Sequence, residues 1–185
     1  FLSSYVYGIP KYLPINTSHP TKPHNDYSKI KLECEKLCKK YKEKYDLNTI
    51  ILRLFNIYGK GQKDGYIFPD LMKQIKNKKI FLKNINAKRD FLHIDDLVSL
   101  IKKILIYNSE KYKILNVGSG VSTSIKEIID IVKTENNNLQ FFETKSSSKN
   151  LIKDCYADID ELKKLYNWKP KISIVEGIKK ILSNE

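Results

Sequence analysis

The spacing of apolar residues along the chain predicts strands that alternate with helices. An apolar run rich in β-branched residues, "TIILRLFNIYG" at 49–59, is typical of a buried strand, and "YKILNVGSG" at 112–120 predicts another. Phe1 to Ser4 has the composition of the last residues of a strand. Because strand–helix–strand alternation is typical of parallel βαβ units, we expect an α/β fold built on a parallel sheet.

Helical periodicity predicts a long helix between the first two strands. Pro20 and Pro23 exclude an earlier start, and Asn25 or Asp26 can cap the amino terminus of this helix. Apolar residues recur along it at spacings of three and four, which is the pattern of an amphipathic helix. The residues of this stripe are Tyr27, Ile30, Cys34, Leu37, Cys38, Tyr41 and Tyr45.

Periodicity also predicts helices at 94–106 and 124–133, the second with a cap among Ser122, Thr123 and Ser124. The stretch 134–150 has loop composition, with a short strand expected at 139–143.

Three glycines follow the second strand, with the spacing G-x-G-x-x-x-G. Gly59, Gly61 and Gly65 miss the dinucleotide-binding fingerprint by one residue, and no helix is predicted directly after them. We therefore interpret this segment as a surface loop, with a role in cofactor binding as the alternative.

Composition limits the class of protein. The chain has 185 residues, which is enough for one domain with a core. Its net charge of +13 comes from scattered lysines, which favours a solvated surface, with attraction to phosphate-bearing ligands as the alternative. Both arginines, Arg53 and Arg89, fall in the motif-like stretches "LRLFN" and "KRDFLHIDD". The planar fork of arginine grips phosphate or carboxylate, so both are functional candidates.

Several classes of protein are disfavoured. No apolar run is long enough to span a bilayer, and the chain start lacks the pattern of a secretion signal. Cys34, Cys38 and Cys155 are too few for a disulfide framework and lack the spacing of zinc ligands. We expect reduced packing cysteines, no metal site and a cytoplasmic protein.

Tyr27 and Lys31 carry the most informative chemistry. Residues four apart lie side by side on a helix, so this pair sets an ammonium beside a phenol. A free phenol titrates near ~10, and its use as a base near neutral pH requires about 4 kcal/mol. One cation at about 4 Å, in a medium of effective dielectric constant about 20, supplies roughly that energy. Alone, Y-x-x-x-K is a weak signal, because tyrosine and lysine are abundant here.

Ordered motifs around this pair strengthen the interpretation. The blocks "SSYVYG", "YSKIKLECE", "ILRLFNIYGKGQ", "KRDFLHIDDL", "ILNVGSG" and "ADIDELKKLYNWKPKISIVEGI" follow one another along the chain. In this order they resemble the extended short-chain dehydrogenase/reductase family, in particular its NAD-dependent nucleotide-sugar epimerase/dehydratase group. The resemblance covers essentially the whole chain.

The resemblance implies roles for individual residues. The implied catalytic residues are Ser3, Tyr27 and Lys31, and the implied contacts to NAD, with NADP as an alternative, are Tyr27, Lys31 and Phe55. The implied contacts to a nucleotide-diphosphate sugar are Ser3, Asn56, Tyr66, Ile67, Phe81, Leu82 and Arg89.

Some of these residues also have a purely structural interpretation. Asn56 can be a turn residue, and Arg89 can form a structural ion pair with Asp90, Asp95 or Asp96. The following residues are interpreted as structural: His93 with Asp95 and Asp96 as a helix cap and its partners, and Trp168 as a packing anchor for the substrate lobe.

The implied fold is the carboxyl-terminal portion of a Rossmann-type parallel sheet with a small mixed α/β substrate-binding lobe. Residues 1–59 and 88–120 would form mainly the Rossmann core, and 60–87 and 121–185 mainly the lobe. The family also carries a glycine-rich half before this region, so we interpret the chain as part of a longer enzyme and expect it to be inactive alone.

Two departures from the family pattern bear on the reaction. Dehydratases of the group place Asp-Glu after the serine or threonine, where Ser4 and Tyr5 stand here, which disfavours a 4,6-dehydratase. Many members also carry a phosphate-gripping arginine in a region where this chain offers only Lys145 or Lys149.

The favoured function is therefore an NAD-dependent nucleotide-sugar epimerase that acts through a keto-sugar, commonly at C4. A reductase or dehydrogenase on the same site is the first alternative. A non-catalytic, nucleic-acid-binding relative of the fold is the second, although no basic aromatic RNA motif is visible. We further expect a homodimer through the helix that carries Tyr27, and neither nucleic acid nor membrane as a partner.

Overall fold

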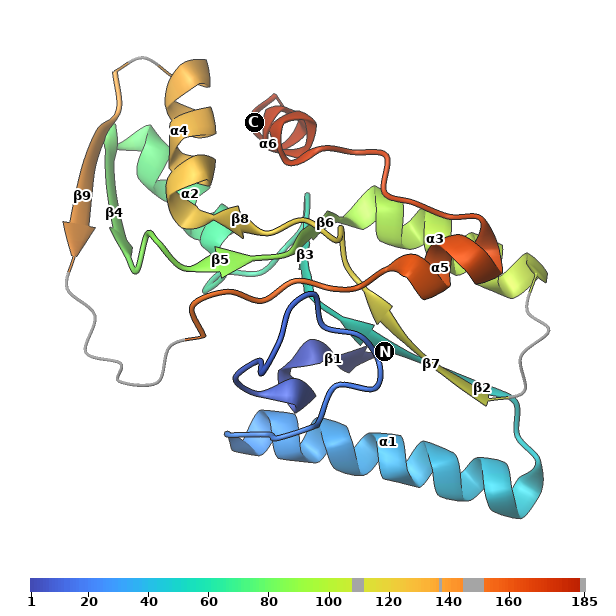
Figure 1. The fold of residues 1–185 in the computed structure, drawn as a ribbon. Coiled ribbons are helices and arrows are strands. Elements are labelled where there is room, and N and C mark those ends of the chain that lie inside the picture. The colour runs from blue at the N-terminus through green and yellow to red at the C-terminus, as the bar shows by residue number, and fades with distance from the viewer. Residues whose placement is uncertain (108–111, 137, 145–151, 184–185) are drawn as a thin grey trace.

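The centre of the molecule is a parallel three-stranded sheet in the order β1–β2–β7 (Figure 1). The computed structural model describes residues 1–107, 112–136, 138–144 and 152–183. The three strands are β1 (Leu2–Ser3), β2 (Thr49–Leu54) and β7 (Tyr112–Val117). The carboxyl ends of all three lie in register, since Ser3 is paired with Leu54 and Leu54 with Val117. The expected α/β class with a parallel sheet is confirmed.

The strand expected at 49–59 is interrupted at Phe55. The amide of Phe55 still donates to the carbonyl oxygen of Val117 at 2.9 Å, but that of Asn56 donates to Asp90 at 3.1 Å. From there β3 (Asn56–Tyr58) pairs with β6 (Phe91–His93) in a separate parallel pair. The chain therefore leaves the main sheet at its carboxyl edge, which a continuous apolar run could not reveal.

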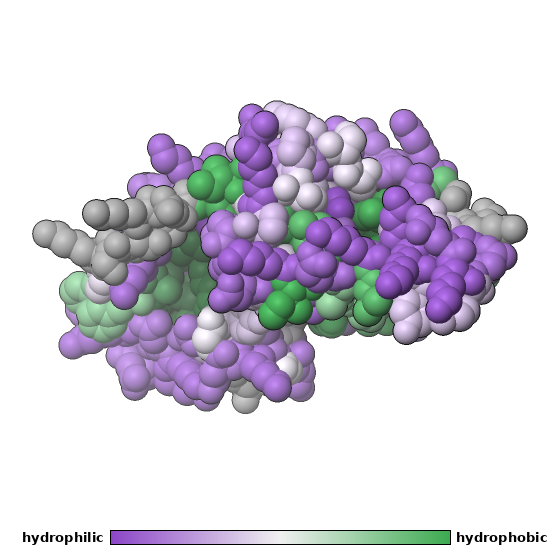
Figure 2. Space-filling view, turned by 90° about the horizontal axis from the view of Figure 1, so that it is seen from below, coloured by the Kyte–Doolittle hydropathy of each residue, from purple (hydrophilic) through white to green (hydrophobic). Residues whose placement is uncertain are grey.

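Helix α1 (Asp26–Tyr45) crosses below the sheet (Figure 1). Asn25 is its cap, because the Asn25 side chain accepts from the amide of Ser28 while the Ser28 hydroxyl accepts from the amide of Asn25. The face in the interior is not the predicted apolar stripe. Its buried residues are Ser28 and Glu35, whereas Ile30, Leu37 and the three tyrosines of the stripe are exposed. Seen from this side, the surface alternates hydrophobic and hydrophilic patches (Figure 2).

A second hydrophobic cluster forms the lobe at the upper left of Figure 1. It packs α2 (Ile67–Lys76), α4 (Ile125–Glu135) and α6 (Ile174–Leu182) around the parallel pair of β4 (Lys79–Lys83) and β9 (Gln140–Thr144). The antiparallel pair of β5 (Lys88–Arg89) and β8 (Thr123–Ser124) leads into it. Ser124 caps α4 in a capping box with Glu127.

The expectation that no helix directly follows the three glycines was wrong. Helix α2 begins at Ile67, two residues after Gly65. Its cap residue, Tyr66, makes no side-chain cap hydrogen bond, so the helix lacks the Ser, Thr, Asp or Asn signal that marks most helix starts.

The boundary of the lobe also differs from the expected division of the chain. Residues of the segment 155–168, which was assigned to the lobe, pack in the first cluster with α3 (Ile94–Tyr107) and the sheet. This segment contains α5 (Asp160–Tyr166). Trp168 lies there too, buried, with its indole nitrogen donating to the Ser99 hydroxyl at 2.8 Å. Trp168 is thus a packing anchor of the core side.

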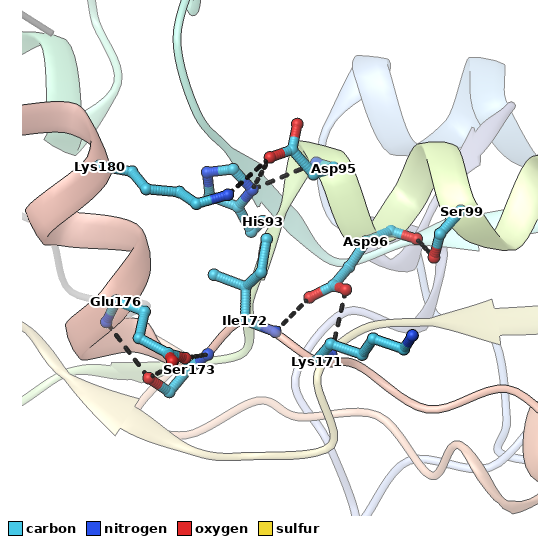
Figure 3. Close-up of polar contacts among 9 residues, drawn as sticks. All are labelled: His93, Asp95, Asp96, Ser99, Lys171, Ile172, Ser173, Glu176 and Lys180. Atoms are coloured by element: carbon cyan, nitrogen blue, oxygen red, sulfur yellow. Dashed lines mark hydrogen bonds and ion pairs between the residues drawn. The ribbon is translucent and has the colours of Figure 1, made fainter.

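Polar contacts at the start of α3 join the lobe to the core (Figure 3). The buried carboxylate of Asp96 accepts from the amides of Lys171 at 3.0 Å and Ile172 at 2.9 Å. Asp95 forms an ion pair with Lys180 of α6 at 3.0 Å. These contacts agree with the structural interpretation of both aspartates.

Within the described part of the chain, no helix is long and apolar enough to cross a bilayer.

We expect His93 to make stability depend on pH. Burial lowers the pKa of His93 below its ordinary value of about 6.5, and its Nδ1 accepts from the amide of Asp95 at 3.2 Å, as a neutral ring does. The unfolded chain then binds a proton that the native chain does not. Stability should therefore fall as pH is lowered from about 7 through the ordinary histidine pKa towards the lower native one.

Urea unfolding of the wild type and of His93→Gln at pH 7, 6 and 5 measures this effect, and the variant should show a shallower decline. His24→Gln, at an exposed histidine, is the matched control and should keep the wild-type slope. Equal slopes for all three proteins would contradict the assignment.

Candidate functional site

A cleft of about 670 Å³ opens at the carboxyl ends of β1 and β2. Open parallel sheets bind ligands at this edge, so its position agrees with the site expected from the sequence. Most of the predicted site residues line it, namely Ser3, Tyr27, Phe55, Asn56, Tyr66, Ile67 and Arg89. Lys31 stands just behind the lining, and Phe81 and Leu82 do not line the cleft.

Tyr27 and Lys31 lie together at the first turns of α1. The Nζ atom of Lys31 is 5.5 Å from the centroid of the Tyr27 ring, as the four-residue spacing predicts. The Tyr27 side chain is 54% exposed and faces the cleft. The phenol is thus accessible to a ligand, with a cation beside its ring.

Ser3 ends β1 and is buried beside the cleft. Its hydroxyl oxygen accepts from the amide of Tyr5 at 3.2 Å and so caps the short 3-10 helix η1 (Ser4–Tyr7). Gly8 ends that helix with a φ of 68°, and a Cβ there would lie 2.1 Å from the carbonyl oxygen of Lys22. The glycine of "VYG" is therefore required for the turn that holds Ser3 and Tyr5 at the cleft.

Tyr5 was singled out in the sequence only as a departure from the dehydratase pattern. In the structure it lines the cleft, and its ring meets that of Tyr27 edge to face with centroids 6.2 Å apart. An aromatic ring thus occupies the position where those enzymes carry a carboxylate. Its place after Ser3 was the available signal.

Phe55 and Asn56 form the floor of the cleft, where the chain leaves the main sheet. Phe55 is buried. The Asn56 side chain donates from Nδ2 to the carbonyl oxygen of Asp90 at 3.2 Å, and its backbone amide donates to the same oxygen. Asn56 is therefore the first residue of strand β3 and is held by the Asp90 carbonyl while it lines the cleft.

Asp90 fixes the segments around this floor. Its carboxylate has no exposed surface and accepts from the Ser119 amide at 2.5 Å, the Ser119 hydroxyl at 2.7 Å, and the amides of Gly120 and Ala157 at 3.0 Å each. Burial raises the pKa of Asp90, and these hydrogen bonds to the charged form oppose that shift. Gly118 allows the approach, since a Cβ there would lie 2.3 Å from the Asp90 carboxylate.

Arg89 enters the cleft from β5. Its Nη1 donates to the carbonyl oxygens of Lys88 and Ile152, each at 2.7 Å. Among the described residues, none of the three aspartates named as alternatives forms an ion pair with it, because Asp90, Asp95 and Asp96 hold the partners given above. The guanidinium is thus steadied by backbone carbonyls at the cleft wall.

The charge of the cleft is one-sided. Lys60 and Lys63 line it together with Arg89, and no aspartate or glutamate of the described residues does. Gln62 holds the loop between them, with Nε2 donating to the carbonyl oxygen of Ile57 at 3.0 Å. Clustered cations with no facing carboxylate favour an anionic ligand. Sequence reasoning missed these residues, because lysines are frequent throughout the chain.

Other candidates lie elsewhere. Arg53 is buried in an ion pair with Glu35, so of the two partners expected for an arginine fork, phosphate or carboxylate, it has a carboxylate. Phe81 is half-exposed on β4 and stacks on Phe142 at 5.0 Å. Lys145 and Lys149 lie outside the described residues.

Two kinds of resident group were tested against the described residues. No group of three or more His, Cys, Asp or Glu side chains among them could hold a metal ion. For NAD, Tyr27 and Phe55 give the cleft an aromatic surface, and the Lys31 ammonium lies beside the Tyr27 ring. Gly59, Gly61 and Gly65 line the cleft ahead of α2 but keep the spacing that departs from the fingerprint.

Known proteins resemble this chain. A CDP-abequose synthase from Salmonella muenchen is 36% identical over 171 residues, which cover 85% of this chain and 55% of that protein. A UDP-glucuronate 4-epimerase from Thermodesulfobacterium geofontis is 34% identical over 165 residues, which cover 87% of this chain and 50% of that protein. This chain therefore spans little more than half the length of such relatives.

The fold is shared as well. The structure of RMD from Pseudomonas aeruginosa complexed with NADPH superposes with a TM-score of 0.91 at 26% identity, over 99% of this chain and 64% of that one. Residues 1–118 match the family described as the NAD dependent epimerase/dehydratase family. The chain belongs to this family, as the ordered motifs around Tyr27 and Lys31 had indicated.

Proposed function

We propose that this chain carries the acid–base and substrate-binding residues of an NAD-dependent nucleotide-sugar epimerase that acts through a keto-sugar, with C4 as the favoured position. The observation that carries the proposal is the placement of Tyr27, with Lys31 behind it and Ser3 nearby, in a cleft lined by cations. Because the chain spans only part of its relatives, the activity is proposed for the complete enzyme.

Each residue of the site has a role in this reaction. Tyr27, as the phenolate, takes the proton of a sugar hydroxyl and later returns it, which is general acid–base catalysis. The Lys31 ammonium, 5.5 Å from the centroid of the Tyr27 ring, places a positive charge beside the phenol. Ser3 hydrogen-bonds the same sugar hydroxyl and orients it. NAD, when bound, supplies a site that accepts hydride from the sugar carbon and returns it.

The chain's own residues would hold the cofactor at one end only. Tyr27, Lys31 and Phe55 would contact the nicotinamide and its ribose. The phosphate-cradling turn that the resemblance implies is a feature of the preceding glycine-rich half.

The substrate would be a nucleoside diphosphate linked to a sugar. Arg89 offers a guanidinium for the diphosphate, and Lys60 and Lys63 add positive charge on the same cleft. Asn56 would contact the sugar. Tyr66 and Ile67 at the start of α2 would line the nucleotide. The resemblance implies the same role for Phe81 and Leu82 of β4, which lie outside the lining of the cleft.

Epimerisation is favoured over 4,6-dehydration because elimination needs an acid and a base next to the serine. Ser4 is buried in η1, and Tyr5 presents an aromatic ring. A reductase is the second candidate. It would use the same tyrosine but would consume the reduced cofactor, and the NADPH in the similar Pseudomonas aeruginosa structure supports it.

Replacing Tyr27 by phenylalanine should abolish most turnover. The hydroxyl moves a proton, a contribution of roughly 10²–10⁴-fold, and makes only one of many substrate contacts, so substrate affinity should change little. The measurement is steady-state turnover of nucleotide-sugars in a form that includes the glycine-rich half. Epimerised product without net NADH formation identifies an epimerase, and stoichiometric loss of reduced cofactor identifies a reductase.

Two further variants complete this experiment. Tyr107→Phe, at an exposed tyrosine of α3, should keep full activity. Lys31→Met should shift the ascending, low-pH limb of the pH profile to higher pH, because Tyr27 acts as the phenolate, and should weaken cofactor binding. If Lys31→Met leaves the pH profile unchanged, Lys31 is only a solvated helix residue.

Arg89→Lys should weaken nucleoside-diphosphate binding by roughly 1–3 kcal/mol, because lysine replaces a bidentate fork by a point charge. The melting temperature should change little. Calorimetric titration with UDP and thermal unfolding of the same variant measure the two effects, with Lys88→Arg on the exposed neighbour as a control. A lowered melting temperature with unchanged affinity would instead assign Arg89 to a structural role.

We also propose a homodimer in which α1 takes part. Its exposed stripe presents Ile30, Leu37, Tyr41 and Tyr45 next to one another on one side of the helix. Such a surface is typical of a contact between subunits. Sedimentation at micromolar concentration should give a dimer, and Leu37→Lys should convert it to a monomer. A monomeric wild type would refute the assignment.

A further inference from the structure

A buried ion pair lies on α1, on the sheet side of the helix. Arg53 of β2 is 5% exposed and Glu35 of α1 is 4% exposed. The contact is bidentate, with Nε of Arg53 donating to Oε1 of Glu35 at 2.8 Å and Nη2 donating to Oε2 at 2.6 Å. Two parallel hydrogen bonds of this kind fix both the distance and the relative orientation of the two groups.

The pair is tied to the rest of the core by a chain of hydrogen bonds. Nη1 of Arg53 donates to the Tyr7 hydroxyl at 2.8 Å, and that hydroxyl donates to Oδ1 of Asn116 at 2.7 Å. Asn116 on β7 in turn donates from Nδ2 to the carbonyl oxygen of Ile15 at 2.7 Å. Arg53 therefore connects α1 to two strands of the sheet and to the segment that follows η1.

Arg53 remains charged under all working conditions. Burial alone would lower the pKa of the guanidinium, but the hydrogen bonds that it donates to Glu35 and Tyr7 raise this pKa above its ordinary value. The pair is neutral as a unit. Buried ion pairs contribute little net stability, because the loss of hydration offsets most of their attraction. Its main effect is thus on geometry.

Glu35 lies on the same helix as Tyr27 and Lys31, so the orientation of Glu35 also affects theirs. Lys31 is one turn before Glu35 and Tyr27 is two turns before it, so about 6 and 12 Å separate them along the axis. The three residues follow one side of the helix, turned by about 40° at each step. The apolar stripe of α1 is largely exposed, so the core-facing side of the helix consists of Ser28, Leu32 and the Glu35–Arg53 pair.

We propose that Glu35 and Arg53 are positioning residues that set the rotation of α1 and thereby hold Tyr27 and Lys31 towards the cleft. Neither residue touches the cleft itself, as its lining contains neither. The consequence for catalysis rests on the function proposed above, whereas the effect on the helix can be measured without any activity.

The decisive variant replaces both charges by apolar groups of similar length, Glu35→Met with Arg53→Met, in the 185-residue chain. Because an apolar pair can replace a buried ion pair at little cost, the melting temperature should stay within about 5 °C of the wild type. The contact between the Tyr5 and Tyr27 rings should be lost from the NMR spectrum. Amide exchange at 28–32 should become at least about tenfold faster, with β2 and β7 unchanged.

Two further variants keep the experiment decisive. Glu33→Gln removes the exposed ion pair with Lys36 on the same helix. It should leave the contact between the Tyr5 and Tyr27 rings and the amide exchange at 28–32 as in the wild type. If the double variant does not fold, Glu35→Gln is measured instead, and it should show the same local loss. The proposal is overturned if the ring contact and the exchange at 28–32 persist, or if exchange accelerates equally throughout the protein.

The outcome is separable from that of the proposed function. Loss of helix positioning in a protein whose Tyr27→Phe form retains activity would uphold the role of the pair and refute the catalytic tyrosine. If the double variant keeps the position of α1 and the Tyr27→Phe form is inactive, the role of the ion pair is refuted and the catalytic tyrosine is upheld.

Discussion

The buried carboxylate of Asp90 is the contact on which the geometry of the cleft depends. Its oxygens bind the turn after β7 and the returning segment at Ala157, while its backbone oxygen accepts from both the amide and the side chain of Asn56. A single residue thus joins the end of the sheet, the return of the chain to the core and the floor of the cleft. Because the carboxylate is fully buried, each of its hydrogen-bond donors offsets part of the cost of removing it from water.

Two buried carboxylates, those of Asp90 and Glu35, therefore have different structural roles. Asp90 gathers backbone amides and sets the floor of the cleft, whereas Glu35 meets a guanidinium and orients the helix on one of its walls. The cleft between them contains cations without facing carboxylates. This separation of signs leaves the positive charge of Arg89, Lys60 and Lys63 available to an anionic ligand, because the nearby acids are already satisfied by other donors.

Local sequence signals predicted the elements that they could encode. Helix α1 starts at the expected cap, α3 and α4 lie within a residue or two of the predicted bounds, and the three main strands are present. The lobe was harder to predict. The segment from α2 to β4 lacks a capping residue and β4 was not predicted, whereas β9 lies within one residue of the strand expected at 139–143. Nor did the sequence reveal that 155–168 would return to the core.

By itself, the sequence determined the parallel α/β class, the pairing of Tyr27 with Lys31 and the family, because helix spacing and ordered motifs are local properties of a chain. Only the tertiary structure decided which face of α1 is buried, where β2 leaves the sheet, and which of the two arginines reaches the cleft. Arg53 and Arg89 both sit in motif-like stretches, yet one is neutralised by Glu35 and the other faces the cleft. That difference arises from partners 18 and 63 positions away along the chain, which no local pattern specifies.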